Sequence, residues 1–232
     1  MNKGIIKRIY RASDIEKIDK KIKLLGTNQK ITFDAVTFLN TRMITTIILS
    51  IILIAFSNMK YYIIPFIIIL YYYLFYYILI TNPLNKRTKK LDREALPFFE
   101  ILALTLETGK NLENALEITC RNIDSELSNE FKKSLMEMRF GKSFMESLKN
   151  LKDRIPSSTI NGIILNIMQT DVFGNSIIET INNQVDYLRE KQIMEVKGEI
   201  NKIPNKVSII SVIFIIPLIL LIILGPFIMS LI

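Results

Sequence analysis

The side chains that most often carry chemistry in proteins are scarce in this sequence. Its 232 residues include no His and a single Cys, Cys120. Without histidine the chain lacks the usual proton shuttle at neutral pH and the commonest metal ligand. A lone cysteine forms neither an internal disulfide nor a thiolate metal cage, and Cys120 falls on an apolar helix face, where we expect it to be buried. The sequence therefore predicts no metal site and no cofactor.

The remaining polar residues form no catalytic motif. There is no P-loop and no nucleophile elbow, and the Asp and Glu residues fall on polar faces of predicted helices, where we expect them to be solvated. We therefore expect no enzymatic activity. A transporter or channel is also disfavoured, because such proteins place ionisable residues inside the membrane and the long apolar stretches of this chain have uncharged centres.

Three glycines have the most informative spacing in the chain. Gly109, Gly141 and Gly174 lie 32 and 33 residues apart, and each ends an apolar-periodic segment. A glycine in this position adopts the left-handed backbone conformation that closes a helix. Two residues after each glycine stands a residue that caps the start of a helix: Asn111, Ser143 and Ser176. The repeat predicts three tight turns between antiparallel helices.

These turns either serve the architecture alone or also contact a partner, and the spacing leaves both interpretations open. In the second case, the residues that directly follow the glycines would make the contact. The candidates are Lys110, Asn111, Lys142 and Ser143.

Helical periodicity between the turns predicts an antiparallel bundle of about six helices. No stretch alternates with a period of two, so we expect no strands. The predicted helices span about 92–108, 111–122, 126–140, 143–154, 157–172 and 176–200.

Three apolar stretches are each long enough for the roughly 20 residues that cross a hydrocarbon core. The first two, about 36–57 and 61–80, predict a membrane hairpin, and the third covers 207–232. Prolines and a glycine inside the third stretch remove helical hydrogen bonds and predict a kink. These residues are Pro217, Gly225 and Pro226.

The fold class predicted is all-α: an integral membrane protein with three transmembrane helices and a cytoplasmic bundle. Its four parts are a basic N-terminal segment with an amphipathic helix, a transmembrane hairpin, a cytoplasmic helical domain and a C-terminal transmembrane helix. They span residues 1–35, 36–81, 82–205 and 206–232.

The positive charge gathers beside the apolar stretches. The net charge is +8, and residues 1–42 hold ten basic and four acidic residues, a net charge of +6. Because Lys and Arg flank the cytoplasmic ends of membrane spans, we expect the N-terminus and the bundle in the cytoplasm and the C-terminus outside. The bundle itself is nearly neutral, which disfavours nucleic-acid binding.

A basic amphipathic helix is predicted at about 13–25. Its apolar face holds Ile15, Ile18, Ile22 and Leu25, and lysines lie elsewhere on it. This face either rests on anionic lipid or packs on the bundle or a partner, and the residues leave both interpretations open.

The ordered set of motifs resembles a known family. The run from Leu96 to Ala103, the sequence Gly109-x-x-Leu112-x-x-Ala115-Leu116 and the later glycine turns are similar to the F-domain proteins (GspF-like) of type II secretion and type IV filament machines. One F domain between a hairpin and a single span is most similar to the tight-adherence (Tad/Flp) pilus platform proteins.

The resemblance implies an inner-membrane platform protein that couples a hexameric secretion ATPase to pilin or pseudopilin assembly, or to protein export. Full-length F proteins carry two F domains, so it also implies pairing with a paralogue or a second copy. Arg189, in the charged helix before the last span, joins the candidate ATPase contacts. The resemblance covers adhesive pili, secretion pseudopili and archaeal filaments alike. The alternative is a membrane-anchored helical scaffold outside any filament machine.

Overall fold

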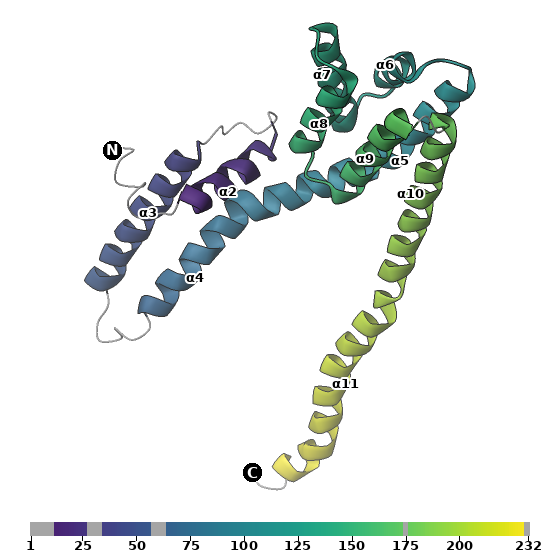
Figure 1. Cartoon of the computed structure of the whole chain (residues 1–232). Helices are drawn as coiled ribbons and strands as arrows, with labels where there is room; N and C mark the ends of the chain where they lie inside the picture. Colours follow the sequence, from purple (N-terminus) through teal and green to yellow (C-terminus); the bar gives the residue numbers. More distant parts are fainter. Residues whose placement is uncertain (1–11, 27–33, 57–63, 174–175, 230–232) are drawn as a thin grey trace. The chain divides into compact units, whose positions relative to one another are not determined.

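The computed structural model describes residues 12–26, 34–56, 64–173 and 176–229 (Figure 1). Every element within these ranges is a helix, which confirms the all-α prediction. The chain divides into two compact units, Met1–Gln184 and Val185–Ile232.

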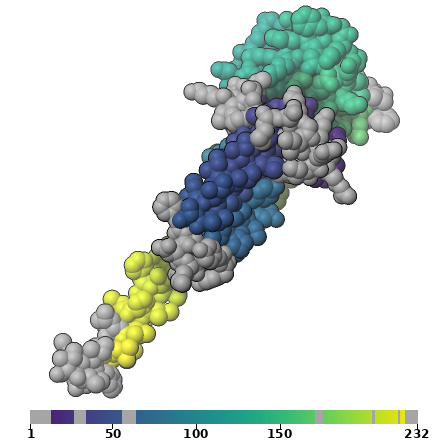
Figure 2. All heavy atoms as spheres, turned by 90° about the vertical axis from the view of Figure 1, so that its left-hand side faces the viewer, coloured from purple at the N-terminus to yellow at the C-terminus, as the bar shows by residue number. Residues whose placement is uncertain are grey.

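The described chain contains three helical stretches that are long and apolar enough to cross a membrane, as predicted. They are Ala35–Ala55, Ile64–Glu107 and Ile177–Leu224. The first two contain α3 (Ala35–Phe56) and α4 (Ile64–Tyr76), which lie side by side (Figure 2). Large apolar side chains stand exposed on both, including Ile51 at 62% and Phe66 at 69%. This is the kind of surface that a lipid bilayer covers.

The second apolar stretch continues into the bundle without a break. After α4 the chain makes a π-helical turn, η1 (Tyr77–Thr81), in which the N–H of Asn82 donates to the carbonyl of Tyr77. Pro83 follows, and its ring would crowd the carbonyl four residues earlier in a regular α-helix. The wider π turn relieves that crowding.

The first bundle helix is therefore longer than predicted. α5 runs from Asn82 to Glu107, directly after η1, whereas the periodicity predicted a helix over about 92–108. The amphipathic pattern begins only where helices pack around α5, so it missed the part that leads out of the apolar stretch.

The other bundle helices begin and end within one residue of their predicted bounds. Their apolar faces build a core in which the ring of Phe98 on α5 stacks on Phe131 of α7, with centroids 4.7 Å apart. Phe99 packs edge-on against both rings, and all three side chains are buried. The helices are α6 (Leu112–Asn122), α7 (Glu126–Arg139), α8 (Phe144–Arg154), α9 (Ser158–Phe173) and α10 (Ile177–Ile200).

The basic amphipathic helix, α2 (Ala12–Lys23), packs on the base of the hairpin. Its Ile18 is buried in a cluster with Phe38 and Leu39 of α3 and Ile80 of η1. The apolar face thus packs on the chain's own hairpin, a surface that the sequence analysis did not consider beside lipid, the bundle or a partner.

In the second unit, α10 is followed by α11 (Lys202–Met229) after a single residue, Asn201. The Asn201 N–H still donates to the carbonyl of Lys197 at 3.0 Å. Pro204 has no N–H to continue this pattern, which accounts for the interruption. α11 includes all the residues for which a kink is predicted, Pro217, Gly225 and Pro226, and the kink itself stays a prediction.

Candidate functional site

The glycine turns gather at one end of the bundle. The start of α7 and the end of α8 both bond to the first half of α5, through Glu94 and Arg87, so the turns at Gly109 and Gly141 both lie at the other ends of these helices. Gly174 lies outside the described residues. The start of α10 still reaches this end, because its Asn182 donates to Glu107 of α5 at 3.4 Å. We call this the glycine-turn end.

Both described turns have the backbone geometry that the sequence predicted. The φ angles of Gly109 and Gly141 are +81° and +94°. The Gly141 N–H donates to the backbone carbonyl of Met138, and the Lys142 N–H donates to the backbone carbonyl of Glu137 at 3.1 Å. This pattern satisfies carbonyls that the helix end would otherwise leave unpaired.

The predicted caps are also in place. The Asn111 side chain accepts from the N–H of Asn114 at 2.9 Å, and the Ser143 hydroxyl accepts from the N–H of Glu146 at 3.2 Å. At the third cap, the Ser176 hydroxyl accepts from the backbone N–H of Glu179 at 3.4 Å. A cap of this kind contributes about 1 kcal/mol.

The structure brings four of the five candidate contact residues to the glycine-turn end. Lys110, Asn111, Lys142 and Ser143 are all exposed there. The fifth, Arg189, stands on α10 and pairs with Asp186 at 3.4 Å. It belongs to the second unit.

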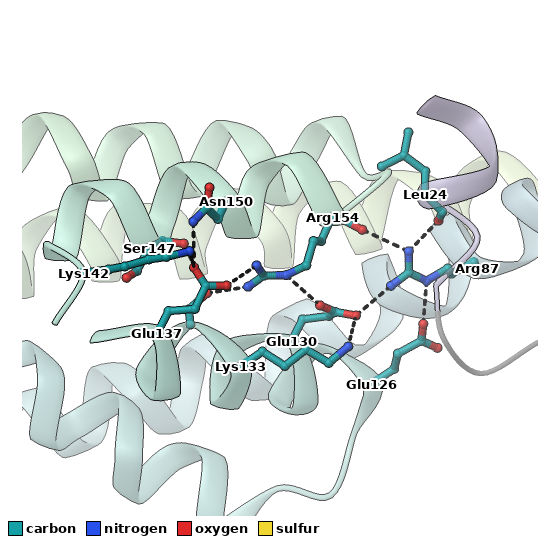
Figure 3. Close-up of polar contacts among 11 residues, drawn as sticks. Leu24, Arg87, Glu126, Glu130, Lys133, Glu137, Lys142, Ser147, Asn150 and Arg154 are labelled. Carbon is teal, nitrogen blue, oxygen red and sulfur yellow. Dashed lines mark hydrogen bonds and ion pairs between the residues drawn. The ribbon is translucent and has the colours of Figure 1, made fainter. Parts of the chain in front are cut away.

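The opposite end of the bundle holds a buried ion-pair network, centred on Arg87, that the sequence analysis missed (Figure 3). Arg87 of α5 binds Glu126 at 2.6 Å and Glu130 at 3.1 Å, both on α7. Its guanidinium also donates to the backbone carbonyls of Leu24 and Arg154. One side chain thus joins α5, α7, the end of α8 and the segment after α2.

Gly26 fits closely against this guanidinium. Its φ is +77°, and a Cβ added there would lie 2.9 Å from the Arg87 Cζ. The position therefore needs glycine both for its backbone conformation and for its space. It follows α2, which ends at Lys23, two residues before the predicted bound of about 25.

The ion pairs continue from Arg87 along α7 to the glycine-turn end. The Glu130 carboxylate binds Arg154 at 3.1 Å, and Arg154 in turn binds Glu137 at 2.5 Å. Glu137 pairs with Lys142 at 3.0 Å, beside the Gly141 turn. We call this chain of contacts, from Arg87 to Lys142, the polar ladder.

Basic partners shift the pKa of two carboxyl groups in this network, Glu137 and Glu126. Burial alone would raise the pKa of Glu137, but hydrogen bonds from Asn150, Lys142 and Arg154 lower that pKa to about 2. Burial likewise opposes ionisation of Glu126, and hydrogen bonds from Arg87 and Lys90 lower its pKa nonetheless. Glu126 and Glu137 are therefore ionised at neutral pH, and basic partners hold both carboxylates in place.

The prediction that the carboxylates are solvated is wrong for Glu130, whose side chain is 5% exposed. A signal was available: residues 126, 130, 133 and 137 recur at spacings of four, three and four, which places them on one face of α7. Cys120 is buried, as predicted, and burial raises the pKa of its thiol. In the ranges that the structure describes, no three His, Cys, Asp or Glu side chains are grouped to hold a metal.

The sequence of this chain matches one known protein family. The family described as "Type II secretion system (T2SS), protein F" matches residues 98–225, from the core of α5 through the bundle into α11. No curated protein and no solved structure matches the chain. Because the matched region covers more than half of its length, the chain belongs to the type II secretion system protein F family.

Proposed function

We propose that this chain is an inner-membrane platform protein of a tight-adherence-type pilus or a related secretion machine. A hexameric secretion ATPase acts on its bundle, and the resulting movement passes through the spans to pilin or pseudopilin subunits. The chain itself performs no catalysis. Membership of the protein F family supports a platform role in secretion or pilus machinery in general.

One observation carries this proposal: a single helical stretch joins an apolar segment to the glycine-turn end. It runs from Ile64 to Glu107, 44 residues without a break, which is about 66 Å at the helical rise. A load applied at the glycine-turn end reaches the bilayer through this helix and not through a flexible linker. The polar ladder supports the transfer, because it ties α7 and α8 together along their length and joins them to α5 at Arg87.

The orientation that supports this proposal places the N-terminus and the bundle in the cytoplasm and the C-terminus outside. The excess of Lys and Arg in residues 1–42 favours it. Impermeant maleimide tests it on a Glu113→Cys chain in a Cys120→Ala background, because Glu113 is exposed on α6. Labelling is expected only after lysis, and labelling of intact cells would overturn the orientation.

Co-purification from the native host tests the function. The full chain, extracted in a mild detergent, is expected to retain a secretion ATPase together with a paralogous F-domain protein or a second copy of itself. The double variant Lys110→Gln/Lys142→Gln is expected to lose the ATPase, whereas Lys149→Gln/Lys152→Gln, which removes the same charge from α8, retains it. A wild-type chain that brings down no ATPase would instead favour a generic membrane scaffold.

A further inference from the structure

A surface pocket of about 480 Å³ lies between α2 and the end of α4. Three lysines of α2 line it, Lys17, Lys20 and Lys21, together with Tyr76 of α4. Asp14 is the one acidic side chain among the described residues that line it, so these residues together carry a formal charge of +2. A pocket of this charge favours an anionic group.

Tyr76 has a hydrogen-bond donor left for such a group. The Lys21 Nζ donates to the Tyr76 hydroxyl oxygen at 2.9 Å and lies 5.5 Å from the centre of the ring. A phenol that accepts a hydrogen bond still carries its own O–H. The lysines and this hydroxyl together offer the charged and neutral donors that phosphate oxygens accept.

The hairpin fixes the level of the pocket relative to a bilayer. Arg42 is the last charged residue before the uncharged run that begins at Met43. Its guanidinium stacks 3.3 Å from the ring centre of Tyr72 and lies 5.6 Å from that of Tyr76. Tyrosines concentrate where a span meets the headgroups, and Tyr73 and Tyr77 are exposed beside Tyr76. Tyr76 therefore lies at the headgroup level of the leaflet.

The packing of α2 keeps the pocket at that level. Ile18 is buried in the cluster with α3 and η1, so the helix is fixed against the hairpin. Lys21 of this helix reaches Tyr76 at the end of α4. When the hairpin spans the bilayer, phospholipid phosphates are present at the level of this pocket. Soluble anions are not concentrated there, so a lipid headgroup is the favoured occupant.

We propose that this pocket binds the phosphate headgroup of an anionic phospholipid. The proposal rests on the membrane insertion and orientation given above, and not on any ATPase contact. The lipid holds α2 against the end of α4 and so stiffens the joint at which the second span becomes α5.

Native mass spectrometry of the full chain in detergent, mixed with equal amounts of phosphatidylglycerol and phosphatidylcholine, tests this proposal. The wild-type chain is expected to retain one phosphatidylglycerol in preference to phosphatidylcholine. Lys17→Gln/Lys20→Gln/Lys21→Gln is expected to weaken that retention by at least about tenfold, because each lysine beside an anionic headgroup adds to the attraction. Replacing the same three lysines with Arg should restore it.

The matched control removes three charges outside the pocket, Lys23→Gln/Lys149→Gln/Lys152→Gln, and is expected to keep the lipid. Equal loss in the control, or no preference for phosphatidylglycerol in the wild type, would overturn the proposal. So would displacement of the lipid by inorganic phosphate alone, which would mark a site for a soluble anion, or by an acidic peptide of a partner.

Tyr76→Phe keeps the ring and removes only the hydroxyl, so it decides the question should the lysine variants fail to fold. Loss of a hydrogen bond to a charged group predicts roughly tenfold weaker retention, and unchanged retention would overturn the proposal. A chain that still brings down the ATPase but binds no anionic lipid refutes this inference and leaves the proposed function intact.

Discussion

Arg87 of α5 and Glu130 of α7 form a buried ion pair, with 3.1 Å between Nη2 and Oε1 and side-chain exposures of 7% and 5%. The other Glu130 oxygen binds Arg154 of α8. Removing a buried charge from such an arrangement is far more costly than removing an exposed one, because the remaining charges stay desolvated. Glu130 is therefore the point at which three helices of the bundle are held together.

Glu130→Gln tests this role. The variant leaves Arg87 and Arg154 near each other without the carboxylate between them, and the free energy of unfolding is expected to fall by about 3–5 kcal/mol. Urea unfolding of the full chain in detergent micelles, followed by circular dichroism, measures it. Lys23→Gln, which breaks the exposed pair with Asp19, should leave the curve unchanged, and equal losses in the two variants would contradict the account.

Three glycine-to-alanine variants separate backbone strain from steric conflict. At Gly109 a Cβ meets nothing within 4 Å, so only the positive φ opposes alanine, at a cost of about 1–2 kcal/mol. Gly26→Ala is expected to cost more, because its Cβ would also meet Arg87 at 2.9 Å. Gly162, inside α9 with open space around it, is the control.

Gly162→Ala is expected to stabilise the chain by about 0.5–1 kcal/mol, because alanine loses less backbone freedom in a helix. Thermal unfolding of the three variants checks the order. A Gly26 variant as stable as the Gly109 variant would show that α2 does not rest on the Arg87 guanidinium.

Stability should depend on pH through Glu137. Its pKa in the folded chain is lowered from 4.5 to about 2, so the folded state favours the ionised form. The resulting stabilisation is fully present above about pH 4.5 and is lost as the pH falls toward 2. Urea midpoints at neutral pH and at pH values inside this window measure the loss. Glu137→Gln should show a smaller loss across it, and an unchanged slope would contradict this assignment.

The parts of the fold that the sequence predicted are set by local rules. A positive φ at Gly109 and a side-chain cap at Asn111 need only a few neighbouring residues, so both turns and the helix bounds near them follow from spacing. The buried faces around Phe99 and Phe131 follow from helical periodicity in the same way.

The missed parts depend on contacts that are distant in sequence. Arg87 was not singled out from the sequence, and it is buried because Glu126 and Glu130, 39 and 43 residues later, pack against it. The position of α2 likewise depends on the joint contribution of α3 and η1 to one cluster. Composition and periodicity describe one helix at a time, so they do not predict which residues of two different helices will be in contact.

Photo-crosslinking in the native host tests the platform role most directly. A photoreactive residue is placed at Lys110 or Lys142, at the glycine-turn end, or at Asp124 or Asp153 near the opposite end of the bundle. The account predicts a crosslink to a hexameric secretion ATPase from the first pair and not from the second. Crosslinks to the ATPase only from Asp124 or Asp153, or from none of the four positions, would contradict it.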